Sequence, residues 1–144
     1  MAAWRAVIDL PSSLHAPATA RRVVADLLRG WGLHALVADA EQVVTEIVTN
    51  AVVHAPGADS YELELVYRPD GVRIYLADGS AVRPVVRELD AQHPRGRGMR
   101  VVAALTSGWG CEQHHGGKRV WVDLDLDRDL DLNDATSTPH TPGR

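Results

Sequence analysis

The sequence predicts an α+β protein built as a two-layer sandwich, with helices on one face of a mainly antiparallel mixed sheet. Two observations predict this class. Segments whose apolar residues recur at helical spacing alternate with segments of period two, in the order strand, helix, helix, two strands, loop, helix, two strands. Within each pair of strands only a short turn separates the two, which favours antiparallel hairpins.

The N-terminal half supplies one strand and two helices. Residues 4–10 have strand character and end at a proline. In residues 12–32 the apolar positions follow helical spacing, and glycines close the segment. A second helix is expected from about Val37 to His54, where the sequence APG stops it.

The C-terminal half supplies two hairpins and a third helix. Residues 61–68 and 72–78 alternate on either side of a Pro-Asp-Gly turn. The stretch 79–96 contains two prolines and no sustained period, so it is expected to be mostly loop. A helix is expected to open straight after Gly98, followed by a hairpin of residues 108–115 and 118–126, whose first strand holds Cys111 as a small apolar residue.

From the last part of this hairpin onward, five aspartates stand at every second position and interleave with leucines: Asp123, Asp125, Asp127, Asp129 and Asp131. A calcium site is one interpretation, but a single strand face cannot bring five carboxylates to one ion. An edge strand with a solvated face that resists aggregation is the preferred prediction. Residues 133–144 have the composition of a disordered tail, which leaves 1–132 as a single domain.

Composition narrows the functional classes. A chain of 144 residues with 45% apolar and 24% charged residues is typical of a globular domain. It has no apolar run long enough to span a membrane, and one cysteine cannot form an internal disulfide. No secretory signal is expected from the N-terminal residues, and a cytoplasmic location is expected. The net charge of -4 argues against direct nucleic-acid binding. The local cluster Arg95, Arg97 and Arg100 suits one anionic ligand.

Three polar features carry the functional argument. Glu46, Asn50 and His54 stand four residues apart along the border of an apolar helix, which on its own is typical of an ordinary helix edge. Asp78 and Gly79 end a strand, which on its own indicates a turn. The sequence Gly-Arg-Gly at 96–98 opens a helix, where free N–H groups and close backbone approach suit a phosphate.

In this order the three features make a complete set of nucleotide-binding parts, and the chain resembles the GHKL ATPases, the Bergerat-fold superfamily that includes gyrase and histidine kinases. It is most similar to small stand-alone members related to the anti-sigma-factor serine kinases of Gram-positive bacteria. The resemblance runs from about Trp4 to Leu126. Its motifs are TEIVTNAVVHA as the N box, LADGS and GRGMRVVAAL as the two glycine boxes, and GGKRVWVDL as the closing strand.

The resemblance implies a role for each matching residue. Asn50 would hold Mg²⁺ through its amide oxygen, and Glu46 would act as general base. Asp78 would accept the hydrogen bond of the adenine amino group. His54 has no clear family role and is expected to be a boundary or supporting residue. The remaining residues implied in nucleotide binding are Gly79, Gly96, Arg97, Gly98, Met99 and Arg100.

The function implied is that of an ATP-dependent protein serine/threonine kinase, which binds a sigma factor and phosphorylates an anti-sigma-factor antagonist, with a homodimer left open. Two positions depart from the family pattern. Ser80 stands where the first glycine box has its glycine, and Arg119 stands where many relatives have threonine. Arg119 is expected either to pair with a phosphate or to point to solvent beside Asp123. The departures favour an alternative, a non-catalytic module that docks a partner protein.

Overall fold

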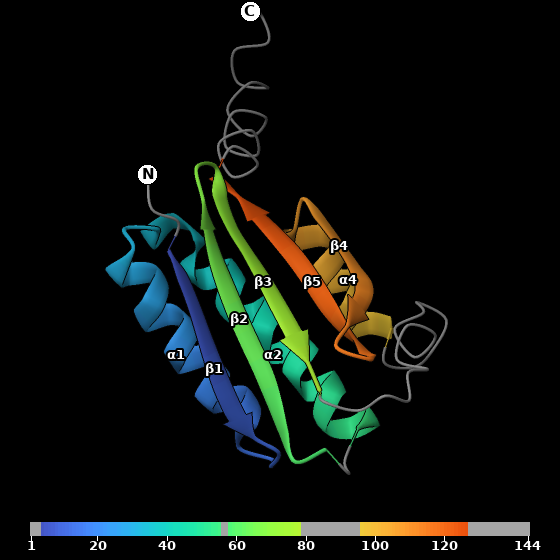
Figure 1. The fold of residues 1–144 in the computed structure, drawn as a ribbon. Coiled ribbons are helices and arrows are strands. Elements are labelled where there is room, and N and C mark those ends of the chain that lie inside the picture. The colour runs from blue at the N-terminus through green and yellow to red at the C-terminus, as the bar shows by residue number, and fades with distance from the viewer. Residues whose placement is uncertain (1–3, 56–57, 79–95, 127–144) are drawn as a thin grey trace, which may run out of the picture.

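The computed structural model describes residues 4–55, 58–78 and 96–126 of the chain (Figure 1). Its elements are β1 (Arg5–Pro11), α1 (Ala16–Gly30), the 3₁₀ helix η1 (His34–Leu36), α2 (Val37–His54), β2 (Ser60–Arg68), β3 (Gly71–Ala77), α4 (Gly96–Leu105), β4 (Gly108–His114) and β5 (Gly117–Asp125). The sequence did not predict η1, which runs directly into α2; such tight single turns are common at helix ends.

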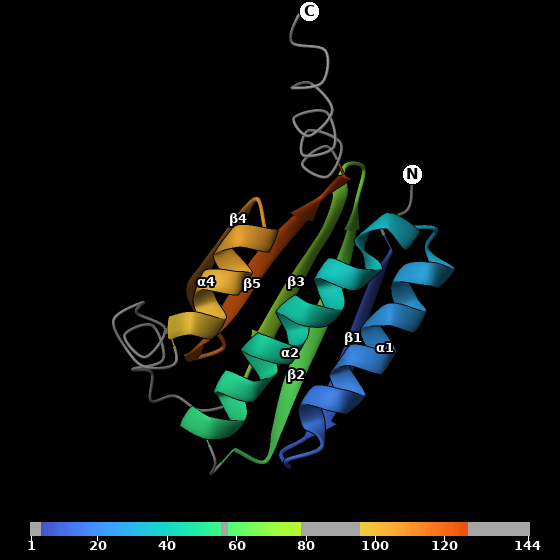
Figure 2. The same cartoon turned by 180° about the vertical axis from the view of Figure 1, so that it is seen from behind.

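The five strands form one sheet in the order β1-β2-β3-β5-β4, and every adjacent pair in it is antiparallel. Helices α1, α2 and α4 all lie on one face of this sheet, and the two opposite views show no described helix on the other face (Figures 1 and 2). The predicted α+β sandwich is confirmed, with a described sheet that is antiparallel throughout.

The helix-covered face holds the core. Alternate residues of β2 and β3 turn toward the helices and are fully or nearly fully buried, among them Leu63, Leu65 and Ile74. Helix α2 lies beside α1 over the sheet (Figure 2) and buries Val44 and Val48 completely. Since each such side chain contributes about 1.5–3 kcal/mol on burial, this apolar arc fixes the rotation of α2. It therefore also fixes the side on which the polar stripe lies.

Two expectations about the elements were wrong. Helix α4 begins at Gly96, two residues before the glycine after which it was expected to open. The strand that carries Asp123 is not at an edge: β5 pairs with β3 on one side and with β4 on the other. The cause is the order of the strands, because the hairpin partner β4 takes the edge and leaves β5 inside.

Several predictions concern residues outside the described ranges. These are the loop expected at 79–95, the aspartates from Asp127 to Asp131 and the tail at 133–144. Among the described helices, none is both long enough and apolar enough to cross a membrane. Within the same ranges no cluster of three or more histidine, cysteine, aspartate or glutamate side chains is arranged to hold a metal ion.

Candidate nucleotide-binding site

The polar stripe of α2 runs along the border of the buried face of the helix. Glu46 and His54 are half-buried, whereas Asn50, one turn from each, is only 7% exposed. Side chains four residues apart on a helix are neighbours, so the three form one row. If the stripe were an ordinary solvated helix edge, the side-chain amide of Asn50 would be exposed to water. The burial of Asn50 distinguishes this stripe from such an edge.

The amide of Asn50 lacks a partner that a folded protein would be expected to provide. Its nitrogen is buried and finds no hydrogen-bond acceptor among the described residues. A buried unsatisfied donor costs roughly 1–3 kcal/mol, and buried polar groups are otherwise almost always paired. The amide oxygen is a hard donor of the kind that Mg²⁺ prefers, and the nitrogen can donate to a phosphate or water. The side chain therefore fits a polar ligand better than it fits the core.

Asp78 follows the last residue of β3. It is 7% exposed, as closely enclosed as the apolar residue before it, Ala77. An aspartate at a strand end is usually a solvated turn residue; this one lies inside the molecule instead. The next two positions, Gly79 and Ser80, lie outside the described residues, so the predicted roles of both stay predictions.

Helix α4 places the second glycine box at its first turn. Gly96, Arg97 and Gly98 all lie within the helix, although the side chains of residues 96–98 are outside the description. Met99 is buried in the core and Arg100 is exposed. The first N–H groups of a helix have no partner within it and carry a partial positive charge. The start of α4 is therefore suited to an anion, and Met99 anchors it to the core.

These parts meet at one end of the molecule. The C-terminal part of α2, the end of β3 and the start of α4 all lie at the lower end of the sandwich in both views (Figures 1 and 2). Helices α2 and α4 also pack against each other. The C-terminal part of α2, the strand end that precedes Asp78 and the start of α4 are thus brought to the same end of the two-layer sandwich, although they are up to about fifty residues apart in sequence.

Arg119 does not belong to this site, and both expectations for it were wrong. It lies on the face of the sheet away from the helices, because its neighbours Lys118 and Val120 share the other face. Its guanidinium donates to Glu112 at 2.8 Å and to Glu64 at 3.1 Å, and it stacks 3.6 Å over the ring of Tyr75. The side chain is only 17% exposed. Its role is to hold strands together.

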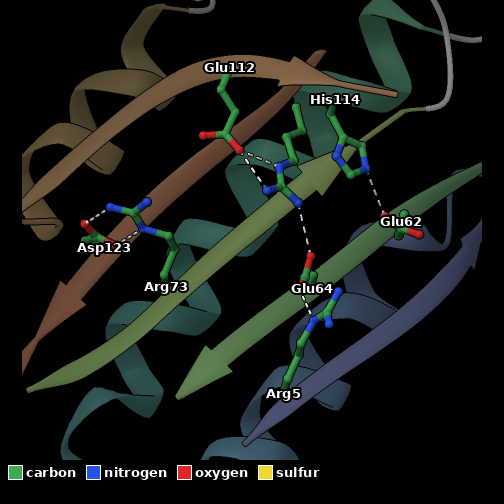
Figure 3. Close-up of polar contacts among 8 residues, drawn as sticks. Arg5, Glu62, Glu64, Arg73, Glu112, His114 and Asp123 are labelled. Atoms are coloured by element: carbon green, nitrogen blue, oxygen red, sulfur yellow. Dashed lines mark hydrogen bonds and ion pairs between the residues drawn. The ribbon is translucent and has the colours of Figure 1, made fainter. Parts of the chain in front are cut away.

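The same open face carries a second group of ion pairs, around Asp123, of which Figure 3 draws the pair with Arg73. Arg73 donates to the two carboxylate oxygens of Asp123 at 2.7 and 2.8 Å, and Arg68 adds a third bond at 3.1 Å. The hydrogen bonds to Asp123 raise the pKa of Arg73 above its ordinary value, although burial acts in the opposite direction. Arg73 also lies 4.4 Å over the Trp121 ring. Asp123 is thus a structural anchor of the sheet and not a solvated edge residue.

Lys118 is a residue to which sequence reasoning gave no role. The alternation of β5 places it on the same face as the buried Val120 and Val122, the face that the helices cover. It stands at the start of β5, at the end of the sandwich where β3 ends (Figure 1). The signal was present in the sequence, since apolar residues occupy every second position after Lys118.

The fold and this convergence of parts are those of a nucleotide-binding domain. A sequence model of the histidine kinase-like ATPase domain matches residues 10–124, and the chain belongs to that family. Domains of this family bind ATP, usually with Mg²⁺. A search among curated protein sequences finds no significant match to the chain.

Proposed function

We propose that the chain is a Mg²⁺-dependent protein serine/threonine kinase of the anti-sigma type. In this proposal it binds a sigma factor and transfers the γ-phosphoryl group of ATP to a serine of an anti-sigma-factor antagonist. The observation that carries the proposal is the pair of Glu46 and Asn50, one helical turn apart on α2, the helix whose C-terminal part lies at the end of the sandwich where β3 ends and α4 begins (Figure 1). The partner proteins rest on the family resemblance alone.

In this proposal, different residues bind the metal ion, the adenine and the phosphates. Asn50 would hold Mg²⁺ through its amide oxygen, and Asp78 would accept a hydrogen bond from the adenine amino group. The backbone N–H groups at the start of α4, from Gly96 to Arg100, would bind the phosphates. When bound, Mg²⁺ neutralises negative charge on the phosphates. The buried amide nitrogen of Asn50, which has no acceptor among the described residues, would then be able to donate to a phosphate oxygen or a water.

Glu46 would take part in the transfer itself. It is half-buried on α2, so the residue is partly open to solvent, as a group that meets a protein substrate would need to be. The serine oxygen forms a bond to the γ-phosphorus while the bond from that phosphorus to the β–γ bridging oxygen breaks. The hydroxyl proton passes to the Glu46 carboxylate, and ADP leaves.

The alternative is a module that binds ATP and a partner without transfer. One of its two supports is weakened, because Arg119 lies on the open face of the sheet, on the side away from the residues of the proposed nucleotide site. The other, Ser80, lies outside the described residues. The buried Asn50 and the neighbouring Glu46 favour the kinase.

Phosphoryl transfer separates the two. The full chain is incubated with Mg²⁺ and γ-labelled ATP together with each anti-sigma-factor antagonist encoded in the same genome. We expect phosphoserine on one antagonist, lost in Glu46→Ala with ATP affinity changed less than about threefold, since the general base contributes about 10²–10⁴-fold to rate and little to binding. Gln42→Ala is the control, an exposed residue one turn earlier on α2. ATP binding with no transfer to any antagonist would establish the non-catalytic alternative.

A further inference from the structure

Lys118 is the single lysine of the chain, among 15 lysine and arginine residues. It is half-buried, at the second residue of β5. In the described residues no acid lies within ion-pair distance of it, whereas the next residue, Arg119, is bound by two glutamates. A half-buried lysine without a described counter-charge, on the face that the helices cover, is a candidate to bind a ligand.

The register of the sheet, extended by one residue beyond the end of β3, would set Asp78 opposite Lys118. On β3 and β5, Leu76 lies opposite Val120 and Ala77 lies opposite Arg119. Continuing the antiparallel register by one residue puts Asp78 opposite Lys118. Leu76 and Val120 are both buried under the helices, and residues two apart share a face, so Asp78 and Lys118 belong to that same face. Directly opposite residues of an antiparallel pair have Cβ atoms about 4.5–5.5 Å apart.

An acid and a lysine at opposite positions of two neighbouring strands, with their charged groups too far apart to pair with each other, can together match one edge of adenine. On the Watson–Crick edge the amino group at C6 is a donor, and the neighbouring ring nitrogen N1 is an acceptor. The carboxylate of Asp78 can accept only, and the ammonium of Lys118 can donate only. In the same orientation guanine would set its carbonyl against the carboxylate and its N1–H against the ammonium, so both contacts would be repulsive.

We propose that Lys118 donates a hydrogen bond to adenine N1, next to the amino group bound by Asp78, and that this pair selects adenine over guanine. The inference rests on the proposed nucleotide site. A carboxylate alone does not distinguish the two bases, because it accepts hydrogen bonds from guanine donors as readily as from the adenine amino group. The lysine adds a hydrogen-bond donor, which adenine N1 can accept and guanine N1–H cannot.

Calorimetry with two nucleotides isolates this contact. The ligands are ATP and 1-deaza-ATP, in which C–H replaces N1, each with Mg²⁺, and the proteins are the full-length wild type and Lys118→Met. We expect wild type to bind ATP about tenfold or more tightly than 1-deaza-ATP, as for a hydrogen bond to a charged group. Lys118→Met should bind both with the lower affinity. The control is Arg29→Met, which removes an exposed positive charge from the far end of α1.

Each other result overturns the proposal in an identifiable way. If Lys118→Met weakens both nucleotides by the same factor, the ammonium acts on the phosphates. If it weakens neither, Lys118 makes no contact. If wild-type protein binds no ATP at all, the proposed nucleotide site fails, and the inference falls with it.

A measurement on the wild type alone guards against a misfolded variant. As the chain has one lysine, acetylation of its ε-amine can be followed by mass spectrometry at a single site, resolved from the N-terminal amine. We expect adenosine, which has no phosphate, to slow acetylation of Lys118 severalfold, and inorganic tripolyphosphate to leave it unchanged. Protection by tripolyphosphate and not by adenosine would contradict the contact with the base.

Discussion

Replacing Arg119 by methionine should destabilise the fold without affecting nucleotide binding. The substitution keeps much of the stem and removes the guanidinium that joins Glu112 of β4 to Glu64 of β2, across β5 and β3. The side chain of Glu64 is only 7% exposed, so its carboxylate is stabilised by its ion-pair partners rather than by water. One partner remains, because Arg5 also donates to Glu64 (Figure 3).

The size of the effect follows from these contacts. Stranding one partner of a buried ion pair costs about 3–5 kcal/mol, and here Arg5 retains part of the compensation for Glu64. The bond to Glu112 counts for less, because that side chain is 38% exposed and screened by water. The stacking on Tyr75 adds about 0.5–2 kcal/mol. We expect a loss of about 2–4 kcal/mol in the free energy of unfolding.

Urea unfolding measures the loss, and calorimetry measures ATP affinity on the same samples. The midpoint should fall at unchanged m-value, since the same surface is exposed on unfolding. The double variant Arg119→Met with Glu64→Gln should recover part of the loss, because it removes the stranded charge. A tenfold drop in ATP affinity with unchanged stability would refute the reasoning and return Arg119 to the nucleotide site.

Three further substitutions test the fold and the site. Asn50→Leu should raise the free energy of unfolding without ligand by about 1 kcal/mol, measured in urea, because it removes the unpaired buried amide, and should abolish Mg²⁺-dependent ATP binding; a destabilised variant would show that the amide is satisfied. Gly110→Ala should cost about 1–2 kcal/mol, since its Cβ would lie 3.0 Å from the Trp121 ring; an unchanged melting temperature would contradict that packing. Gly71→Ala should cost about 3 kcal/mol or more, or prevent folding, because its Cβ would lie 1.9 Å from the carbonyl oxygen of Leu124; full expression and stability would show that β3 and β5 do not approach this closely at Gly71.

Local sequence patterns were enough to predict most of the helices and strands. The alternation around the Pro-Asp-Gly turn predicted the β2–β3 hairpin, and the helical spacing up to His54 predicted α2 to its last residue. The family resemblance pointed to the buried Asn50 and Asp78, whose local sequences read equally well as a helix edge and a turn. Composition and period determine such elements because each element must bury its own apolar face.

The order of the strands in the sheet could not be predicted from such local patterns. Which strand takes the edge depends on how the last hairpin docks on β3, a long-range choice that no local period records. The edge assignment of Asp123 failed for this reason, since the pairing arginines lie some fifty residues earlier in the chain. The side of the sheet on which Arg119 lies could have been predicted, because the alternation of apolar residues in β5 indicates it. The comparison with the threonine that many relatives have at this position led instead to a role at the nucleotide.

The most direct test of the account is calorimetry of ATP binding to the full-length wild type and to Asn50→Ala, each with and without Mg²⁺. The account predicts micromolar binding by the wild type that strengthens with Mg²⁺, and loss of the Mg²⁺-dependent part in Asn50→Ala while that variant remains folded by circular dichroism. A folded wild type that binds no ATP would contradict the proposed site. So would an Asn50→Ala protein whose Mg²⁺ dependence equals that of the wild type.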